Sequence, residues 1–345
     1  MRAMKNATRA IPVDLLRIFA ASAIFYFHCG LATGWPLFHW GEFAVATFIF
    51  LTSACAMRYS QVAAGEAPAY WWARFKAIYP TFAIISVLLY VASFIYQPHK
   101  TGSHYTLADI ASNLLLISQF IGRPWMTDPM WFVPFVLQVY LILPLLTGIQ
   151  VRWQTMLAAF LVSGTACAAV YALHPAQPNF AYGLCRSWSP IFLLPEVLFG
   201  CFLGRARSVA DGVAPVVIYA GCCAAAALLA MLYPQASPLL FLPLKGLLVF
   251  LVLAGFVAAV LPFIKNEQSK IISLFGRASF PFFLLHGPGM TFINARFGSN
   301  ILAWILYFVF CWAAALVFML TLEKARRPHA VRSAPTNEAR STCIR

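Results

Sequence analysis

Most of this chain consists of apolar runs that are separated by short polar segments. Many of these runs approach the roughly 20 residues that an α-helix needs to cross the hydrocarbon core of a bilayer. Only 10% of the 345 residues are charged and 62% are hydrophobic, whereas soluble domains carry about 25% charged residues. The sequence therefore predicts a polytopic, all-α integral membrane protein.

The apolar runs predict a bundle of ten transmembrane helices and one shorter helix. The spans are expected at residues 12–31, 41–57, 77–96, 129–149, 154–173, 189–204, 212–233, 238–263, 275–295 and 300–321. Residues 107–121 form a short run with several polar side chains, so we expect an interfacial or re-entrant helix at the outer face. The predicted organisation is a basic cytoplasmic N-terminus (1–11), a membrane domain (12–322) and a basic cytoplasmic tail (323–345).

Basic residues set the predicted orientation of the bundle. If residues 107–121 do not cross, 19 of the 24 Lys and Arg fall at ends assigned to the cytoplasm. The remainder are Lys100, Arg123, Arg186 and Arg296 outside, and Lys245 within a span. Enrichment of Lys and Arg on the cytoplasmic side is the general rule for membrane proteins, so both termini are predicted to be cytoplasmic. The net charge of +14 follows the same pattern and does not indicate a nucleic-acid partner.

The first apolar run carries three ionisable residues: Asp14, Arg17 and His28. Arg17 and His28 are eleven residues apart, which places them on one helical face and about 16 Å apart along the axis. Ionisable residues are costly in lipid and usually face a cavity or a partner. The alternative is that Arg17 is a basic flank and His28 a structural core histidine.

The chemistry of Arg17 and His28 fits a transfer reaction across the membrane. An imidazole can deprotonate a hydroxyl nucleophile near neutral pH. An arginine at the cytoplasmic mouth can hold phosphate in a bidentate fork. Together they suit a donor that comes from the cytoplasm and an acceptor that comes from outside.

The motif Asp14-x-x-Arg17, followed by ten residues and His28, resembles the opening of the membrane-bound acyltransferase 3 family. Further stretches resemble motifs of that family in the same order, at residues 41–54, 70–80, 130–144, 199–204 and 276–286. The resemblance covers about residues 13–322. The chain departs from the family pattern at Ala54, where glycine is usual, at Ala77, where a second arginine is common, and at Phe283, where tyrosine is usual.

The resemblance implies a ten-helix bundle in a bacterial inner membrane that transfers an acyl group from acyl-CoA, most often acetyl from acetyl-CoA, with succinyl as another donor. The implied acceptor is a hydroxyl of an extracytoplasmic or lipid-linked glycan, either a polysaccharide or a lipid-linked oligosaccharide. The implied surroundings are membrane lipid and glycan-assembly proteins, with no nucleic acid and no metal. Arg17 and His28 carry over as catalytic residues, with His28 acting as general base or as a transient acyl carrier.

Each further candidate has a functional and a structural interpretation. Arg74 and Lys76, together with Arg17, either bind the phosphates of the donor or serve as topological flanks. Asp14 is expected to pair with Arg17, while Glu42 either orients His28 or begins a helix in solvent. Other supporting candidates are Ser53 in the family-like motif, Trp131 and Tyr140 beside an acceptor groove, and His286 as a cross-bundle hydrogen-bonding residue with a structural role.

Two other classes of function remain as alternatives. In a secondary transporter, Arg17, His28, Glu196 and Lys245 would form a substrate and proton path. Such a transporter is expected to show internal repeats, and the sequence has no visible repeat. A membrane partner of a glycan-assembly complex without chemistry of its own is the third class.

Overall fold

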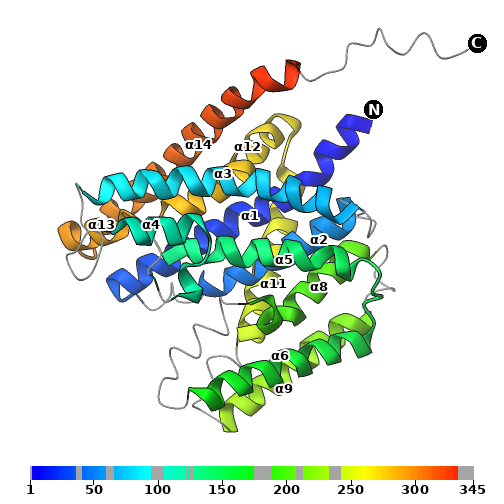
Figure 1. Ribbon diagram of the computed structural model, residues 1–345. Coiled ribbons are helices and arrows are strands. Elements are labelled where there is room, and N and C mark those ends of the chain that lie inside the picture. The colour runs from blue at the N-terminus through cyan, green and yellow to red at the C-terminus, as the bar shows by residue number, and fades with distance from the viewer. Residues whose placement is uncertain are drawn as a thin grey trace, which may run out of the picture.

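The computed structural model describes residues 2–35, 41–59, 66–94, 105–121, 123, 128–174, 189–206, 213–232 and 242–332. All regular structure in these residues is helical, and the long helices pack side by side in one bundle (Figure 1). The ten longer helices are α1 (Arg2–Thr33), α2 (Ala44–Tyr59), α3 (Ala67–Ser93), α5 (Phe132–Leu146), α6 (Trp153–Leu173), α8 (Leu194–Arg205), α9 (Val213–Leu232), α11 (Leu242–Val260), α12 (Asn266–Leu285) and α14 (Ile301–Arg332). The short helices are α4 (Leu107–Leu114), α13 (Met290–Phe297) and the 3-10 turns η3 (Ser118–Phe120), η4 (Asp128–Trp131), η5 (Pro190–Leu193) and η8 (Leu261–Phe263).

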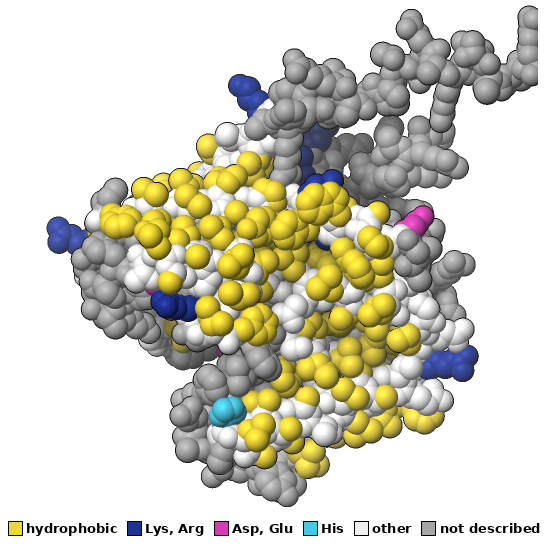
Figure 2. All heavy atoms as spheres, in the orientation of Figure 1, with side chains coloured by type: hydrophobic (Ala, Val, Ile, Leu, Met, Phe, Trp, Pro, Cys, Tyr) yellow, Lys and Arg dark blue, Asp and Glu magenta, His cyan; other side chains and the backbone are white. Residues whose placement is uncertain are grey.

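Helix α1 lies at the centre of the bundle. It packs against α2, α11 and α12, while α14 covers the other side of α12 and α8 covers α2. Helices α6 and α9 pack beside α8, and α3 and α5 form a separate pair that contacts α12 and α2. One face of the bundle is covered mainly by hydrophobic side chains (Figure 2), as expected for a surface that meets lipid.

Seven described helices are long and apolar enough to cross a membrane. They are Ile11–Thr33, Gly41–Arg58, Ala67–Ala92, Pro129–Leu146, Trp153–Leu173, Pro243–Phe263 and Ile301–Lys324. The expectation of ten spans is therefore not confirmed. Helix α8 has only 12 residues, or about 18 Å of helix at 1.5 Å per residue. The expected span at 275–295 is interrupted, because α12 ends at Leu285 and α13 begins at Met290.

Several helices extend beyond the apolar runs that predicted them. Helix α3 begins at Ala67 rather than at 77, so the hydrophilic stretch with Arg74 and Lys76 is helical. Helix α1 includes the basic residues before the first run, and α14 continues to Arg332 within the predicted tail. Hydrophobicity therefore marked the membrane-embedded part of each helix and not its ends.

Glycines allow the central helices to approach closely. A Cβ on Gly200 of α8 would lie 2.7 Å from the carbonyl oxygen of Phe50 on α2, and one on Gly204 would overlap the backbone of Ala54. The two glycines are four residues apart, the spacing at which small residues line a tight helix–helix interface in membranes. A Cβ on Gly41, just before α2, would overlap the carbonyl oxygen of Ala23 on α1.

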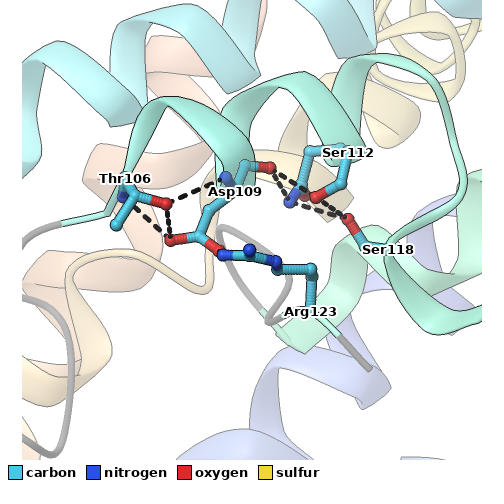
Figure 3. Close-up of polar contacts among 6 residues, drawn as sticks. Thr106, Asp109, Ser112, Ser118 and Arg123 are labelled. Carbon is cyan, nitrogen blue, oxygen red and sulfur yellow. Dashed lines mark hydrogen bonds and ion pairs between the residues drawn. The ribbon is translucent and has the colours of Figure 1, made fainter. Parts of the chain in front are cut away.

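Residues 105–121 and Arg123 belong to a hairpin-like segment (Figure 3). Thr106 caps α4, and its hydroxyl accepts a hydrogen bond from the backbone N–H of Asp109 at 3.2 Å. The chain then reverses at Leu116, which has a positive φ of 61°. It returns to Arg123, whose guanidinium lies 3.1 Å from the Asp109 carboxylate. A short helix is therefore present within the expected range 107–121, but it ends at Leu114, and the Asp109–Arg123 ion pair joins its first turn to the returning chain.

Polar side chains donate hydrogen bonds to backbone carbonyl oxygens inside this hairpin. The amide of Asn113 donates to the carbonyl oxygen of Asp109 at 2.8 Å and to Ser118 Oγ at 3.0 Å. Tyr79 on α3 donates its hydroxyl to the carbonyl oxygen of Leu114 at 2.9 Å, which fixes the hairpin tip against the middle of α3. Burial favours a raised pKa for Asp109, but hydrogen bonds from Thr106 and the charge of Arg123 outweigh it and lower this pKa below its ordinary value. The carboxylate therefore stays ionised, and the hairpin stays pinned, at neutral pH.

The same substitution at two glycines tests the role of close packing. We expect Gly200→Ala to destabilise the fold by about 1–3 kcal/mol, because its Cβ meets the α2 backbone. Gly255→Ala on α11 has no atom within 4 Å of the new Cβ, so it should be neutral or slightly stabilising. Thermal unfolding in detergent measures both. Equal behaviour of the two variants would contradict tight α2–α8 packing.

Candidate functional site

Helix α1 carries a half-buried ion pair between Asp14 and Arg17. Asp14 Oδ1 lies 3.7 Å from Arg17 Nη1, and the Arg17 side chain is 37% exposed. Gly276 of α12 lies directly against this carboxylate, because a Cβ there would be 2.6 Å from Asp14 Oδ1. Helix α12 thus covers Asp14, while the guanidinium of Arg17 remains accessible. The arrangement holds a positive charge at a defined position on the inner face of α1.

Arg74 provides a second cation on the same side of the bundle. Its guanidinium lies over the rings of Tyr70 and Tyr140, 5.1 and 5.5 Å from their centroids. The charges of Arg17, Arg74, Asp14 and Arg58 all act on the thiol of Cys55 on α2, so these groups lie within electrostatic range of the C-terminal half of α2. Tyr70 and Cys55 were not singled out from the sequence. The four-residue spacing of Tyr70 and Arg74, which places them on one helical face, was a readable signal.

Lys76 does not belong to this cluster. Its ammonium lies 5.3 Å from the ring centroid of Trp72, and Trp72 is 58% exposed on the outer surface of α3. Residues two positions apart on an α-helix differ by about 200° in direction. Arg74 and Lys76 therefore face different surroundings, and only the charge of Arg74 acts with that of Arg17 on the Cys55 thiol.

At the other end of α1, two histidines lie side by side. The rings of His28 and His286 have centroids 5.2 Å apart and an interplanar angle of 46°. His28 is partly buried, whereas His286 is fully buried at the C-terminal end of α12. The sequence analysis assigned His286 a cross-bundle hydrogen bond, but in the described residues neither of its ring nitrogens has a hydrogen-bond partner. The hydrogen bond expected from this side chain is therefore not seen among the described residues.

The remaining predicted residues lie around these two ends. Trp131 packs against Phe132 and Phe135 near the start of α5, and Phe132 in turn contacts Phe283 beside His286. The ring of Tyr140 contacts the guanidinium of Arg74 and not Trp131. The two aromatic residues are nine positions apart in the sequence, with Trp131 just before α5 and Tyr140 within it. Ser53 is fully buried at the close α2–α8 contact, where it faces Gly200.

Glu42 lines a small pocket of about 20 Å³ together with Glu196 and Gly246. Glu196 is 2% exposed and its Oε2 has no hydrogen-bond partner among the described residues. Lys245, the other ionisable residue expected within a span, lies 4.9 Å from the ring centroid of Phe43. The pocket lies between α2, α8 and α11, and its volume is close to that of a single water molecule.

The fold and this site define a polytopic membrane protein whose central helix carries a cationic end and a histidine end. The family model described as an acyltransferase domain, that of the acyltransferase 3 family, matches residues 12–323, nearly the whole chain. The chain belongs to this family and is a membrane acyltransferase. No curated protein and no solved structure matches it.

Proposed function

We propose that this protein is an O-acyltransferase that moves an acyl group, most simply acetyl, from cytoplasmic acyl-CoA to a hydroxyl of an extracytoplasmic or lipid-linked glycan. The observation that carries the proposal is the arrangement of α1. The charges of Arg17 and Arg74 both act on the Cys55 thiol of α2 at one end of the site, and His28 lies beside His286 at the other. The axial distance of about 16 Å between Arg17 and His28 is comparable with the extended pantetheine arm of coenzyme A.

In this mechanism the two ends of α1 have separate tasks. Arg17 and Arg74 bind the donor phosphates through charge-assisted hydrogen bonds. His28 accepts the proton of the acceptor hydroxyl as its oxygen attacks the thioester carbonyl carbon. The C–S bond of the resulting tetrahedral intermediate then breaks, and the leaving thiolate takes the proton from His28. An acyl-histidine intermediate on His28 is the alternative route. The family match gives no support to the transporter alternative.

We further propose that all ten longer helices cross a bacterial inner membrane. Their alternating directions support this topology: α2 and α8 run parallel, because Phe50 lies against Gly200 and Ala54 against Gly204. Helices α12 and α14 run antiparallel, as shown by the Arg277–Glu323 ion pair and the hydrogen bond from Tyr307 to the carbonyl oxygen of His286. Even the short α8 is then a crossing element, shielded from lipid by α2, α6 and α9.

Cysteine labelling tests this topology. An impermeant maleimide applied to intact cells should label Arg296→Cys at the end of α13 and should not label Arg152→Cys before α6, both of which are exposed positions. The physical reason is the concentration of Lys and Arg on the cytoplasmic side. Permeabilised cells, in which both should label, are the control. Labelling of Arg152→Cys from outside would rule out the ten-span arrangement.

Measurements of acetyl-CoA binding can distinguish the roles of Arg74 and Lys76 on α3. Arg74→Ala should weaken acetyl-CoA binding by about tenfold or more, since a lost charge-assisted hydrogen bond is worth roughly 1.5–3 kcal/mol. Lys76→Ala is the matched control and should change affinity less than about twofold, because its ammonium lies on the exposed Trp72. Calorimetry in nanodiscs measures both affinities. A larger effect of Lys76→Ala would place the donor on the outer face of α3 instead.

The role of His28 is tested by transfer assays. His28→Ala should fold and bind acetyl-CoA, yet lose transfer of labelled acetyl to isolated surface glycans by at least about a hundredfold, the usual contribution of a general base. His174→Ala at the end of α6 is the matched control and should retain activity. Mass spectrometry of the glycans, run in parallel with succinyl-CoA, identifies the group transferred. Near-normal turnover by His28→Ala would remove it as the base.

A further inference from the structure

The side chains around the His286 ring are apolar apart from that of His28, and polar backbone groups of Phe282 and Phe283 lie close to the ring. Phe282 stacks on the ring at 5.9 Å between centroids, and Phe25 and Phe283 flank it at 6.1 and 5.8 Å. None of these phenyl rings offers a hydrogen-bonding atom. The imidazole is 0% exposed, and neither Nδ1 nor Nε2 has a partner among the described residues. A buried polar group in that condition is destabilising, which calls for a reason other than stability.

The backbone at His286 is held in place independently of its ring. Tyr307 of α14 donates its hydroxyl to the carbonyl oxygen of His286 at 2.8 Å and accepts the backbone N–H of Gly289 at 2.8 Å. A Cβ on Gly289 would lie 2.5 Å from the Tyr307 oxygen, so the glycine makes this close contact possible. The turn after α12 is thereby fixed, and it presents the imidazole toward α1 without using its nitrogens.

The neighbour that the ring faces on α1 is the proposed base. With ring centroids 5.2 Å apart, the imidazoles of His28 and His286 are close enough for one small polar group to contact both. A neutral imidazole carries one N–H donor and one acceptor nitrogen. The pair can therefore accept a proton at one ring and donate a hydrogen bond from the other.

We propose that His286 is a second catalytic residue, which donates its N–H to the carbonyl oxygen of the acyl thioester; this rests on the proposed acyl transfer. When the acceptor oxygen attacks the carbonyl carbon and His28 takes the proton, the carbonyl oxygen becomes an oxyanion. The N–H of His286 stabilises that oxyanion, as preorganised donors do in other acyl transfers. The carbonyl re-forms as the C–S bond breaks, the thiolate takes the proton from His28, and His286 keeps its own proton throughout.

A catalytic and a structural histidine predict opposite effects on stability. His286→Phe removes the unpaired nitrogens and adds an apolar ring among Phe25, Phe282 and Phe283, so its melting temperature should equal or exceed that of the wild type. Its turnover should fall by about 10²–10³-fold, the usual cost of losing one oxyanion donor, with affinity for acetyl-CoA unchanged. His286→Gln keeps an N–H donor and should recover at least about tenfold of that loss.

Tyr307→Phe is the matched control on the neighbouring helix. It leaves the carbonyl oxygen of His286 and the N–H of Gly289 without their partner, so its melting temperature should fall while it retains more activity than His286→Phe. Turnover is followed as release of free thiol from acetyl-CoA, with isolated glycan and with water alone as acceptor. Hydrolysis of acetyl-CoA uses the same general base, His28, and the same N–H of His286. The test therefore does not depend on knowing the acceptor sugar.

The outcomes separate the two proposals. A stable, donor-binding but inactive His286→Phe, partly rescued by His286→Gln, supports an oxyanion donor at this position. A marked drop in the melting temperature of His286→Phe overturns the inference, because the ring then has a structural partner. Full turnover by His286→Phe also overturns it and leaves acyl transfer intact. A wild type that neither transfers nor hydrolyses defeats the proposed function, and the inference fails with it.

Discussion

The close packing of α1 against its neighbours is the constraint on which the site depends. Gly41 lies against the backbone of Ala23, and Gly276 lies against the side chain of Asp14, with no room for a Cβ at either position. Because α2 and α12 approach so closely, Asp14 on the polar face of α1 is covered by protein. The same packing brings His286 of α12 next to His28 of α1.

The buried polar side chains of the hairpin and the ring of His286 differ in whether they are hydrogen-bonded. In the hairpin, the side chains of Asp109, Ser112, Asn113 and Ser118 are all hydrogen-bonded, as a structural role requires. At His286, the ring nitrogens have no partner in the described part of the chain. Buried polar groups in stable proteins are nearly always paired, and the contrast with the hairpin supports the proposal that His286 serves a substrate.

The sequence predicted the polar face of α1 because helical periodicity alone aligns Asp14, Arg17 and His28. It could not predict that His286 lies beside His28, since that contact depends on how α12 packs against α1. The sequence left open whether Arg74 and Lys76 bind phosphate or serve as topological flanks. It did not show that the two side chains face different surroundings, because the segment was not recognised as helical.

Hydropathy was a weaker guide where helices are shielded by protein. Helix α8 is short and buried against α2, so it does not need the apolar length of a lipid-facing span. The hairpin did carry a local signal, since Thr106 followed three residues later by an acidic side chain is a capping pattern. The reversal at Leu116 carried none, because a positive φ at leucine contradicts its intrinsic preference.

The measurement that tests this account most directly is a cryo-EM structure of the protein in nanodiscs with a non-hydrolysable acetyl-CoA analogue. The account predicts phosphates at the guanidinium groups of Arg17 and Arg74, a pantetheine arm along α1, and a carbonyl group within hydrogen-bonding distance of His28 and His286. An analogue bound on the outer surface of α3, or one whose carbonyl lies away from both imidazoles, would contradict it.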